Sequence, residues 1–439
     1  MKLPLPHPFI LLLGTVAFAA LLTWILPSGA YERAPDPSGG RVLVVAGSYH
    51  RVPPAPVGPI AAVMAVPRGI IAGADVVVLI LVVGGAFALL DSTGAMARLV
   101  GAIAGSATRP RVTVALISVV FASLGALENF HEEIIALVPV LLLLSRGLGF
   151  GAITALSMSL GAATVGAAFG PSNPFAAGLA FKFAGLPQLS MAGLRSILLV
   201  IAVAVWIGWT LASVSRDDVR PDVAPNDTQR ATAKDFLLLF TLTLPIVVYV
   251  CGVLSFDWGF NELTSLFLVA GLAVGLLAGR SWRETAESFI KGMESMLAAA
   301  LFVGIARAIS LVLTEGQVID TIVAGLVAPL SRIPVLAAAA LMVPVHALIH
   351  VPVASNSGQA VLTMPIMAPV ADLLGISRDA AVMAYQTGAV LTDLITPTSG
   401  TLLAILLKAD VPYGRWLRFV VPGVLLLWVV GFAGIFIML

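Results

Sequence analysis

Long apolar stretches alternate with short polar ones along almost the whole chain. Seven stretches approach the about 20 residues that a helix needs to cross a bilayer. They span residues 9–26, 75–90, 197–214, 236–254, 266–278, 296–313 and 419–439. The pattern predicts an all-α polytopic membrane protein.

Composition supports this prediction. The 439 residues are 59% hydrophobic and 11% charged, with a mean hydropathy of +1.04, whereas soluble domains are about 45–50% apolar and about 25% charged. A net charge of +1 gives no sign of a nucleic-acid partner. The expected partners are the lipid bilayer and a small-molecule substrate. Stretch 9–26 resembles a signal peptide, but equally apolar stretches follow it, so we expect a first membrane helix.

Two blocks, 112–187 and 336–412, contain apolar pieces too short for ordinary spans. Placed one under the other, they share rare residues at nearly one offset. Four pairs lie 226 positions apart and a fifth lies 225 apart: Pro139 and Pro365, Gly149 and Gly375, Pro171 and Pro397, Lys182 and Lys408, and Pro187 and Pro412. We therefore predict an internal repeat, with an N-terminal half 1–215, a cytoplasmic linker 216–235 and a C-terminal half 236–439.

Each block pairs a helical hairpin with a broken helix. The hairpin tips are "LENFHEEII" (127–135) and "VASNSGQAV" (353–361), and the breaks are "FGPSNPF" (169–175) and "ITPTSGT" (395–401). Lysine and arginine placement puts the N-terminus inside, the first hairpin entering from the cytoplasm and the second from outside. The prediction is thus two inverted repeats, each with a re-entrant hairpin and a discontinuous transmembrane helix.

Non-helical backbone survives in a membrane only where it is buried in protein or lines a watery cavity. A broken helix exposes amides and carbonyls there, which bind anions and cations respectively. Simple proline kinks for packing are the alternative reading. The short polar residues of the breaks and second tip are the predicted substrate ligands: Ser172, Asn173, Ser355, Asn356, Ser357, Thr398 and Ser399.

Ionisable groups at membrane depth are costly and mark function by default. Glu132, Glu133, Asp393 and Thr396 are the candidates for cation or proton coupling, unless the first tip reaches water. Arg307 is either a substrate counter-ion or a helix-end residue that reaches the membrane surface.

His346 and His350 share a helical face but lack the third ligand and glutamate of an H-E-x-x-H site. No metal site or catalytic residue is predicted, and no cofactor apart from a bound sodium ion.

The stretch "SNSGQAVLTMPIMAPVADLLGISRDAAVMAYQTGAVLTDLITPTSGTLLAIL", with "VVGGAFALLDSTGAM" and "NPFAAGLAFKFAGLP", resembles the YfcC-type branch of the anaerobic dicarboxylate carrier family, within the ion transporter superfamily. The resemblance implies the two-repeat fold, an elevator motion, assembly as a homodimer and a site at the tips and breaks. It also implies a first tip reading "GMGEE". Here "NFHEE" keeps the glutamates and replaces the glycines.

We read the chain as a secondary active transporter, a symporter or antiporter, in the cytoplasmic (inner) membrane of a bacterium. Its substrate would be a small organic acid or amino acid, including a dicarboxylate, a basic amino acid or a short-chain fatty acid. Sodium, protons or exchange would drive it. A membrane-embedded enzyme and a passive channel remain the alternatives.

Overall fold

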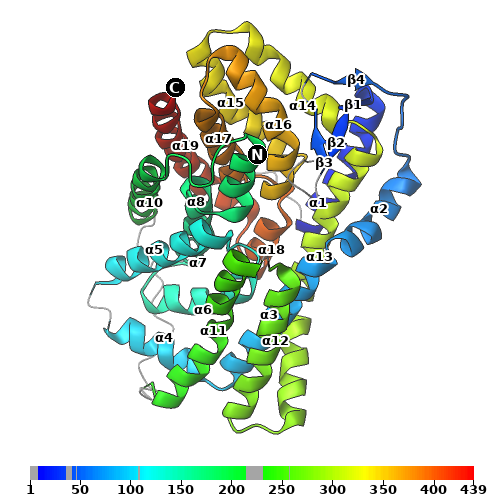
Figure 1. Ribbon diagram of the computed structural model, residues 1–439. Coiled ribbons are helices and arrows are strands. Elements are labelled where there is room, and N and C mark those ends of the chain that lie inside the picture. Colours follow the sequence, from blue (N-terminus) through cyan, green and yellow to red (C-terminus); the bar gives the residue numbers. More distant parts are fainter. Residues whose placement is uncertain (1–7, 36–41, 46, 107–108, 214–230, 257) are drawn as a thin grey trace, which may run out of the picture.

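The computed structural model describes residues 8–35, 42–45, 47–106, 109–213, 231–256 and 258–439, and most of them are helical (Figure 1). The predicted linker 216–235 falls mainly outside the described residues. The helices before it are α1 (Pro8–Ile25), α2 (Pro59–Ala72), α3 (Ala74–Ser92), α4 (Ala95–Ser106), α5 (Pro110–Glu128), α6 (Ile134–Gly147), α7 (Ala152–Leu156), α8 (Ala162–Phe169), α9 (Leu179–Phe183) and α10 (Ala192–Ser213). Those after it are α11 (Ala233–Phe256), α12 (Phe260–Leu277), α13 (Trp282–Glu315), α14 (Ile319–Val327), α15 (Val335–His350), α16 (Asn356–Leu374), α17 (Arg378–Tyr385), α18 (Gly400–Lys408) and α19 (Tyr413–Met438).

Short elements complete the description. Single π-helical turns η1 (Ser157–Gly161), η2 (Pro174–Gly178) and η4 (Gln386–Val390) and the 3-10 turn η3 (Ala328–Arg332) join helices. The antiparallel strand pairs are β1 (Gly29–Ala30) with β4 (His50–Arg51), and β2 (Arg33–Pro35) with β3 (Val42–Val44). Sequence patterning did not predict these strands or α2.

Among the described residues, seven helical segments are long and apolar enough to cross a membrane. They are Ala74–Ser92, Pro110–Glu128, Ala152–Phe183, Ala192–Ser213, Phe260–Leu277, Trp282–Glu315 and Tyr413–Met438. The prediction of an all-α polytopic membrane protein is confirmed. The segment Pro110–Glu128 corrects the expectation that the first hairpin consists only of pieces too short to span.

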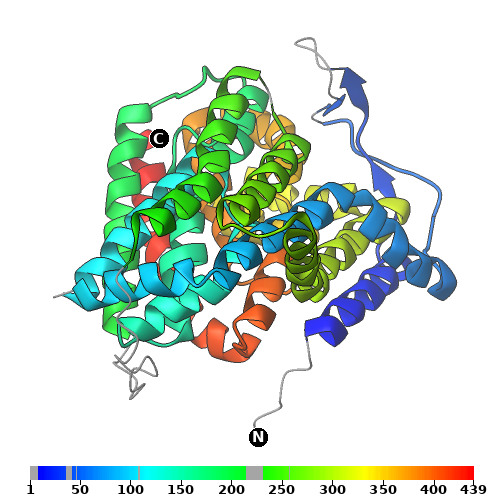
Figure 2. The same cartoon turned by 90° about the horizontal axis from the view of Figure 1, so that it is seen from below.

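The long helix α13 runs beside α2, α3 and α18, and α10 packs on α19 at the opposite edge of the molecule (Figure 1). Small residues permit the closest approach of α3 and α13. A Cβ added at Gly292 would lie 2.8 Å from the Cα of Gly85, a distance that real side chains do not adopt. Viewed from below, α1 and the strands lie at the side of the molecule away from α10 (Figure 2).

Both predicted blocks contain the same series of elements. A hairpin, α5–α6 or α15–α16, precedes a helix with a π-helical turn, a non-helical gap, a short helix and a long helix. The order agrees with the predicted repeat, while the opposite membrane orientation of the halves stays a prediction. The second tip is shorter than predicted, since α16 begins at Asn356. Ser355 caps this helix by accepting a hydrogen bond from the amide of Gly358 at 3.2 Å.

The first break is held by side chains. Asn173 is fully buried, and its Oδ1 accepts from the amides of Phe175 at 3.0 Å and Ala176 at 2.8 Å. Its Nδ2 donates to the carbonyl of Gly125 at 2.7 Å. Ser172 donates to the carbonyl of Ala126 at 3.1 Å. The polar groups of this break therefore bond to the protein's own backbone.

A side chain of the second block also bonds to the first break. Gln386 of η4 donates to the carbonyl of Gly170 at 3.2 Å, and its Oε1 accepts from Arg195 of α10 at 2.5 Å. Arg195 is fully buried and lies 4.7 Å from the ring centroid of Phe181. The gap after α8 is thus also held by one residue, Gln386, that lies 216 positions away in the chain.

Replacing Asn173 with alanine removes a helix cap and a buried hydrogen bond, so the Asn173→Ala protein should lose about 1–3 kcal/mol of unfolding free energy. Melting of the purified protein in detergent measures the loss. Asn261→Ala, a change at an exposed asparagine of α12, is the matched control and should melt as the wild type does. Equal melting of all three proteins would contradict the structural role of Asn173.

Candidate functional site

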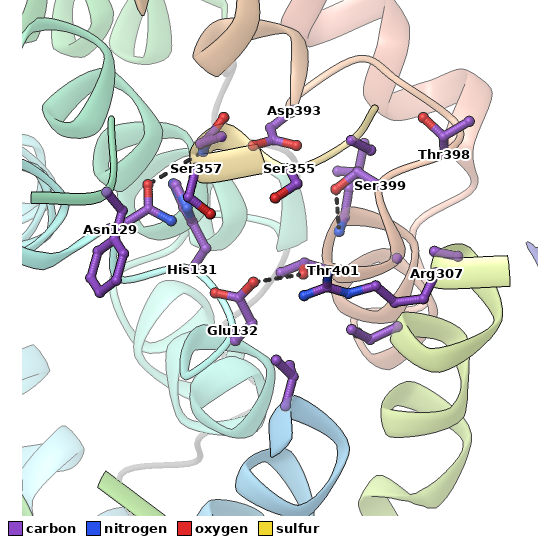
Figure 3. Close-up of a pocket in the computed structure, with 18 of the residues that line it drawn as sticks. Asn129, His131, Glu132, Arg307, Ser355, Ser357, Asp393, Thr398, Ser399 and Thr401 are labelled. Atoms are coloured by element: carbon purple, nitrogen blue, oxygen red, sulfur yellow. Dashed lines mark hydrogen bonds between the residues drawn. The ribbon is translucent and has the colours of Figure 1, made fainter. Parts of the chain in front are cut away.

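A cavity of about 200 Å³ lies where the first tip, the second tip, the second break and α13 meet (Figure 3). By the same measure a single water needs only about 10–15 Å³, so the cavity has room for a small solute. The polar residues that line it are Glu128, Asn129, His131, Glu132, Glu133, Thr164, Arg307, Ser310, Ser355, Asn356, Ser357, Asp393, Thr398, Ser399 and Thr401.

The first tip turns through a left-handed residue. Asn129 ends α5 with φ of +64°, and its amide donates to the carbonyl of Gly125 at 3.1 Å. Asparagine tolerates this conformation better than other side chains do, after glycine. It stands at the first glycine of the "GMGEE" pattern, so the turn survives the substitution. Glu128 and Glu133 are only 4% and 3% exposed, so the tip is buried in protein.

The two tips touch. The Nδ2 of Asn356, the first residue of α16, donates to Oδ1 of Asn129 at 3.3 Å. Tyr385 of α17 donates its hydroxyl to the carbonyl of Asn356 at 2.5 Å. The start of α16 is therefore fixed at the cavity by one residue of the first tip and one helix behind it.

The second break gives the cavity another helix start. Ser399 caps α18 by accepting from the amide of Leu402 at 3.3 Å, and Thr401 donates to Oε1 of Glu132 at 3.5 Å. Thr396 and Thr398 share a hydrogen bond at 2.7 Å. Helices α16 and α18 both begin at the cavity, and their N-terminal amides carry partial positive charge.

Carboxyl groups predominate among the ionisable side chains that line the cavity. Four carboxyl groups line it, those of Glu128, Glu132, Glu133 and Asp393, and the guanidinium of Arg307 lies among them on the α13 side. Figure 3 shows Arg307 reaching from α13 towards Glu132 and Thr401. Arg307 therefore lines the cavity, whereas its role as a substrate counter-ion stays a prediction.

Asp393 is backed by a buried histidine. Its Oδ1 lies 2.9 Å from Nε2 of His350, which has no exposed side-chain surface, while Asp393 is 20% exposed. Nδ1 of His350 lies 2.7 Å from Oε1 of Gln359. His346 lies on the same helical face as His350, and its main-chain carbonyl accepts a hydrogen bond from the side-chain amide of Gln359. Within the described residues no group of three His, Cys, Asp or Glu side chains suits a metal ion.

Most of the predicted site residues come together at the cavity: Ser355, Asn356, Ser357, Thr398, Ser399, Glu132, Glu133 and Asp393. Ser172, Asn173 and Thr396 do not line it. Sequence reasoning left out Ser310, which carries no signal beyond a polar residue in an apolar helix, and it did not count Thr401 at the end of the second predicted break among the ligands. It also missed the role of His350 beside Asp393, since the two lie 43 residues apart in the chain.

A helical protein with several membrane-spanning segments and a partly polar cavity between interrupted helices has the construction of a membrane transporter. A family model described as C4-dicarboxylate anaerobic carrier (DcuC) matches residues 5–439, and the chain belongs to this family. It is therefore a membrane transporter rather than an enzyme.

Two relatives match over nearly their full lengths. A Haemophilus influenzae protein without an assigned function is 29% identical over 96% of this chain and 95% of its own. An Escherichia coli (strain K12) protein, provisionally named basic amino acid antiporter YfcC, is 28% identical over 94% of this chain and 92% of its own.

Two solved structures resemble the fold more distantly. The Alcanivorax borkumensis YdaH transporter is 17% identical with a TM-score of 0.45, covering 98% of each chain. Neisseria gonorrhoeae MtrF, described as illuminating a class of antimetabolite efflux pumps, is 14% identical with a TM-score of 0.41, covering 98% of this chain and 94% of its own. Both scores lie below 0.5, and nothing about this chain follows from either match.

The left-handed turn at Asn129 predicts an order of stability. Asn129→Gly and Asn129→Ala both lose the contact with Asn356. Only the alanine variant is also destabilised by the steric strain of a side chain in the left-handed conformation. The glycine variant should be about 1 kcal/mol more stable than the alanine variant. Denaturant unfolding of the two purified proteins measures the difference, and an alanine variant as stable as the glycine variant would contradict the turn geometry.

Proposed function

We propose that this protein is a secondary active antiporter for an amino acid with a cationic side chain. The observation that carries the proposal is the set of ionisable side chains that line the cavity, four carboxyl groups and one guanidinium. A cleft lined mainly by one sign of charge concentrates solutes of the opposite sign. A cationic solute fits this lining better than a dianionic one.

Buried oxygen atoms that lack a hydrogen-bond donor support the same class of solute. Oε2 of Glu133 and Oδ1 of Asn356 are buried and have no hydrogen-bond partner among the described residues, and both residues line the cavity. Both atoms are acceptors. A guanidinium or ammonium group supplies N–H donors only and satisfies buried acceptors of this kind.

The opposite end of an amino acid also finds suitable groups. Helices α16 and α18 start at the cavity with serine caps, Ser355 and Ser399. Helix N-termini bind carboxylates through their free amides and the helix dipole. We assign the α-carboxylate of the solute to these two helix starts and its cationic side chain to the glutamates of the first tip.

The family description favours a second candidate, a C4-dicarboxylate. Arg307 and the two helix starts could bind the two carboxylates of such a solute. The name of the Escherichia coli relative agrees instead with the first candidate. Arg307 distinguishes them, because it repels a cationic solute and attracts a dicarboxylate.

A binding test separates the two solute classes. The purified protein should gain thermal stability with L-arginine or L-lysine and less with succinate or fumarate, because bound ligand stabilises the folded state. Arg307→Gln should tighten the binding of the basic amino acids and abolish any binding of the dicarboxylates. Stabilisation by succinate alone, lost in Arg307→Gln, would favour the dicarboxylate carrier.

The glutamate of the first tip gives a quantitative prediction. A hydrogen bond to a charged group contributes about 1.5–3 kcal/mol, so Glu133→Gln should weaken L-arginine binding by roughly 10- to 100-fold. Equilibrium binding of labelled L-arginine measures it. Glu287→Gln changes a 63% exposed glutamate of α13 and is the matched control, with unchanged affinity expected. An unchanged affinity in Glu133→Gln would remove this residue from the site.

Transport itself decides between a carrier and a channel. In proteoliposomes, uptake should saturate with solute concentration and should accelerate when unlabelled solute is present on the opposite side. A channel shows neither property, and non-saturating flux would exclude the proposed antiporter.

A further inference from the structure

We propose that the coupling ion is a proton, which Asp393 and His350 share at the wall of the cavity. The proposal rests on the function proposed above for the solute, and it adds the identity of the driving ion. The evidence for the proton is a series of hydrogen bonds from the carbonyl of His346 through Gln359 and His350 to Asp393, in which donor and acceptor are determined at each step.

The direction of the chain is set at its buried end. The side-chain amide nitrogen of Gln359 donates to the main-chain carbonyl of His346 at 2.9 Å. A carbonyl only accepts, so the amide of Gln359 cannot be turned round without setting two oxygens against each other. Oε1 of Gln359 therefore faces Nδ1 of His350, 2.7 Å away.

The tautomer of His350 follows from this orientation. An amide oxygen only accepts hydrogen bonds, so Nδ1 of His350 carries a hydrogen and donates it. In the neutral ring Nε2 is then a bare acceptor. Yet Nε2 lies 2.9 Å from a carboxyl oxygen of Asp393, which is also an acceptor when ionised.

Two acceptors at 2.9 Å require a proton between them. Either Asp393 is a neutral acid that donates to Nε2, or His350 is an imidazolium that donates to the carboxylate. In both cases the pair contains one additional proton and has no net charge. Release of this proton to the cavity leaves a carboxylate beside a neutral ring, with a net charge of −1.

The pair is placed to exchange its proton with the cavity. His350 and Gln359 are fully buried, whereas Asp393 lines the cavity and is 20% exposed. Asp393 thus gives the only route to the cavity within the described chain of groups Gln359, His350 and Asp393. His350 and Gln359 act as positioning residues for it.

Other titratable and charged groups lie near Asp393 and His350 and interact with them electrostatically. From the first tip, α13, α15 and α17, these are His131, Glu132, Arg307, His346 and Tyr385. None of these five groups is hydrogen-bonded to Asp393 or His350 in the described contacts. The side-chain amide of Asn356 is hydrogen-bonded to Asp393, but it does not titrate, so the shared proton belongs to Asp393 and His350.

The charge change gives one-for-one exchange. The deprotonated pair adds a negative charge to the cavity and favours a cationic solute, while the protonated pair favours its release. One proton replaces one unit of solute charge, so exchange is electroneutral. A pH difference of one unit then supports a roughly tenfold solute gradient.

Proteoliposomes with the full-length protein test this stoichiometry. Vesicles with an interior one pH unit more acidic than the medium should accumulate L-arginine roughly tenfold, with no dependence on membrane potential or sodium. Accumulation driven by a sodium gradient, or unaffected by the pH difference, would overturn the proton while leaving the proposed antiporter intact.

The variant Asp393→Asn tests whether the shared proton is needed for accumulation. Its amide nitrogen can still donate to Nε2 of His350, so the local structure is kept, but it binds no exchangeable proton. Accumulation driven by the pH difference should be lost, while exchange of labelled for unlabelled L-arginine continues at a lower rate. Asp372→Asn changes a 47% exposed aspartate on α16 and should accumulate L-arginine as the wild type does. Accumulation in Asp393→Asn equal to the wild type would overturn the proposal.

Gln359→Leu tests the positioning role. Without the acceptor at Nδ1, His350 can change tautomer, so the pH profile of L-arginine exchange should shift relative to the wild type. An unchanged pH profile would show that Gln359 does not set the tautomer and would remove the basis of the shared proton.

A spectroscopic measurement stands even if no tested solute is transported. Infrared difference spectra of the solute-free protein between acidic and alkaline pH should contain carboxyl and imidazole bands that disappear in Asp393→Asn. Identical difference spectra of the two proteins would reject the shared proton. No transport together with loss of these bands would reject the chosen solutes and keep the proton site.

Discussion

Hydrogen bonding of interrupted backbone is the constraint on which the structure depends. A bilayer offers no partners to the amides and carbonyls that a broken helix releases. At the first break Asn173 bonds two amides and a carbonyl, and Gln386 bonds the carbonyl of Gly170. These bonds join distant segments of the chain, so the breaks and the packing of both blocks are determined together.

The two breaks use this constraint differently. The polar side chains of the first break bond within the protein and do not line the cavity, since Asn173 is fully buried and Ser172 donates to a main-chain carbonyl. The second opens onto the cavity through Ser399 and the start of α18. A cavity made from two tips and one break is asymmetric, although the order of elements in the two blocks is the same. In the proposed binding mode, one end of the solute meets the helix starts and the other end meets the carboxyl groups.

The charge of the cavity comes from elements that play different parts in the fold. The first tip and Asp393, just before the second break, supply the carboxyl groups. The second tip and the second break supply the helix N-termini, while Arg307 comes from α13, the long helix that packs on α2 and α3. Any movement of the hairpins relative to α13 would change the distance between this guanidinium and the glutamates. In the proposed function, solute preference would therefore depend on such a movement through Arg307.

Apolar periodicity and length determined the helical, membrane-spanning character, because a helix must be long and apolar to cross a bilayer whatever it packs against. Proline, glycine and polar residues at matched positions also located both tips and the second break, with Glu132, Asn356 and Ser399 among the lining residues. Tertiary structure alone decided that Asn173 supports the fold rather than lining the cavity, and that His350 lies against Asp393. Hydrogen bonds between residues far apart in the chain depend on how the helices pack. The local sequence does not determine which distant group each side chain contacts.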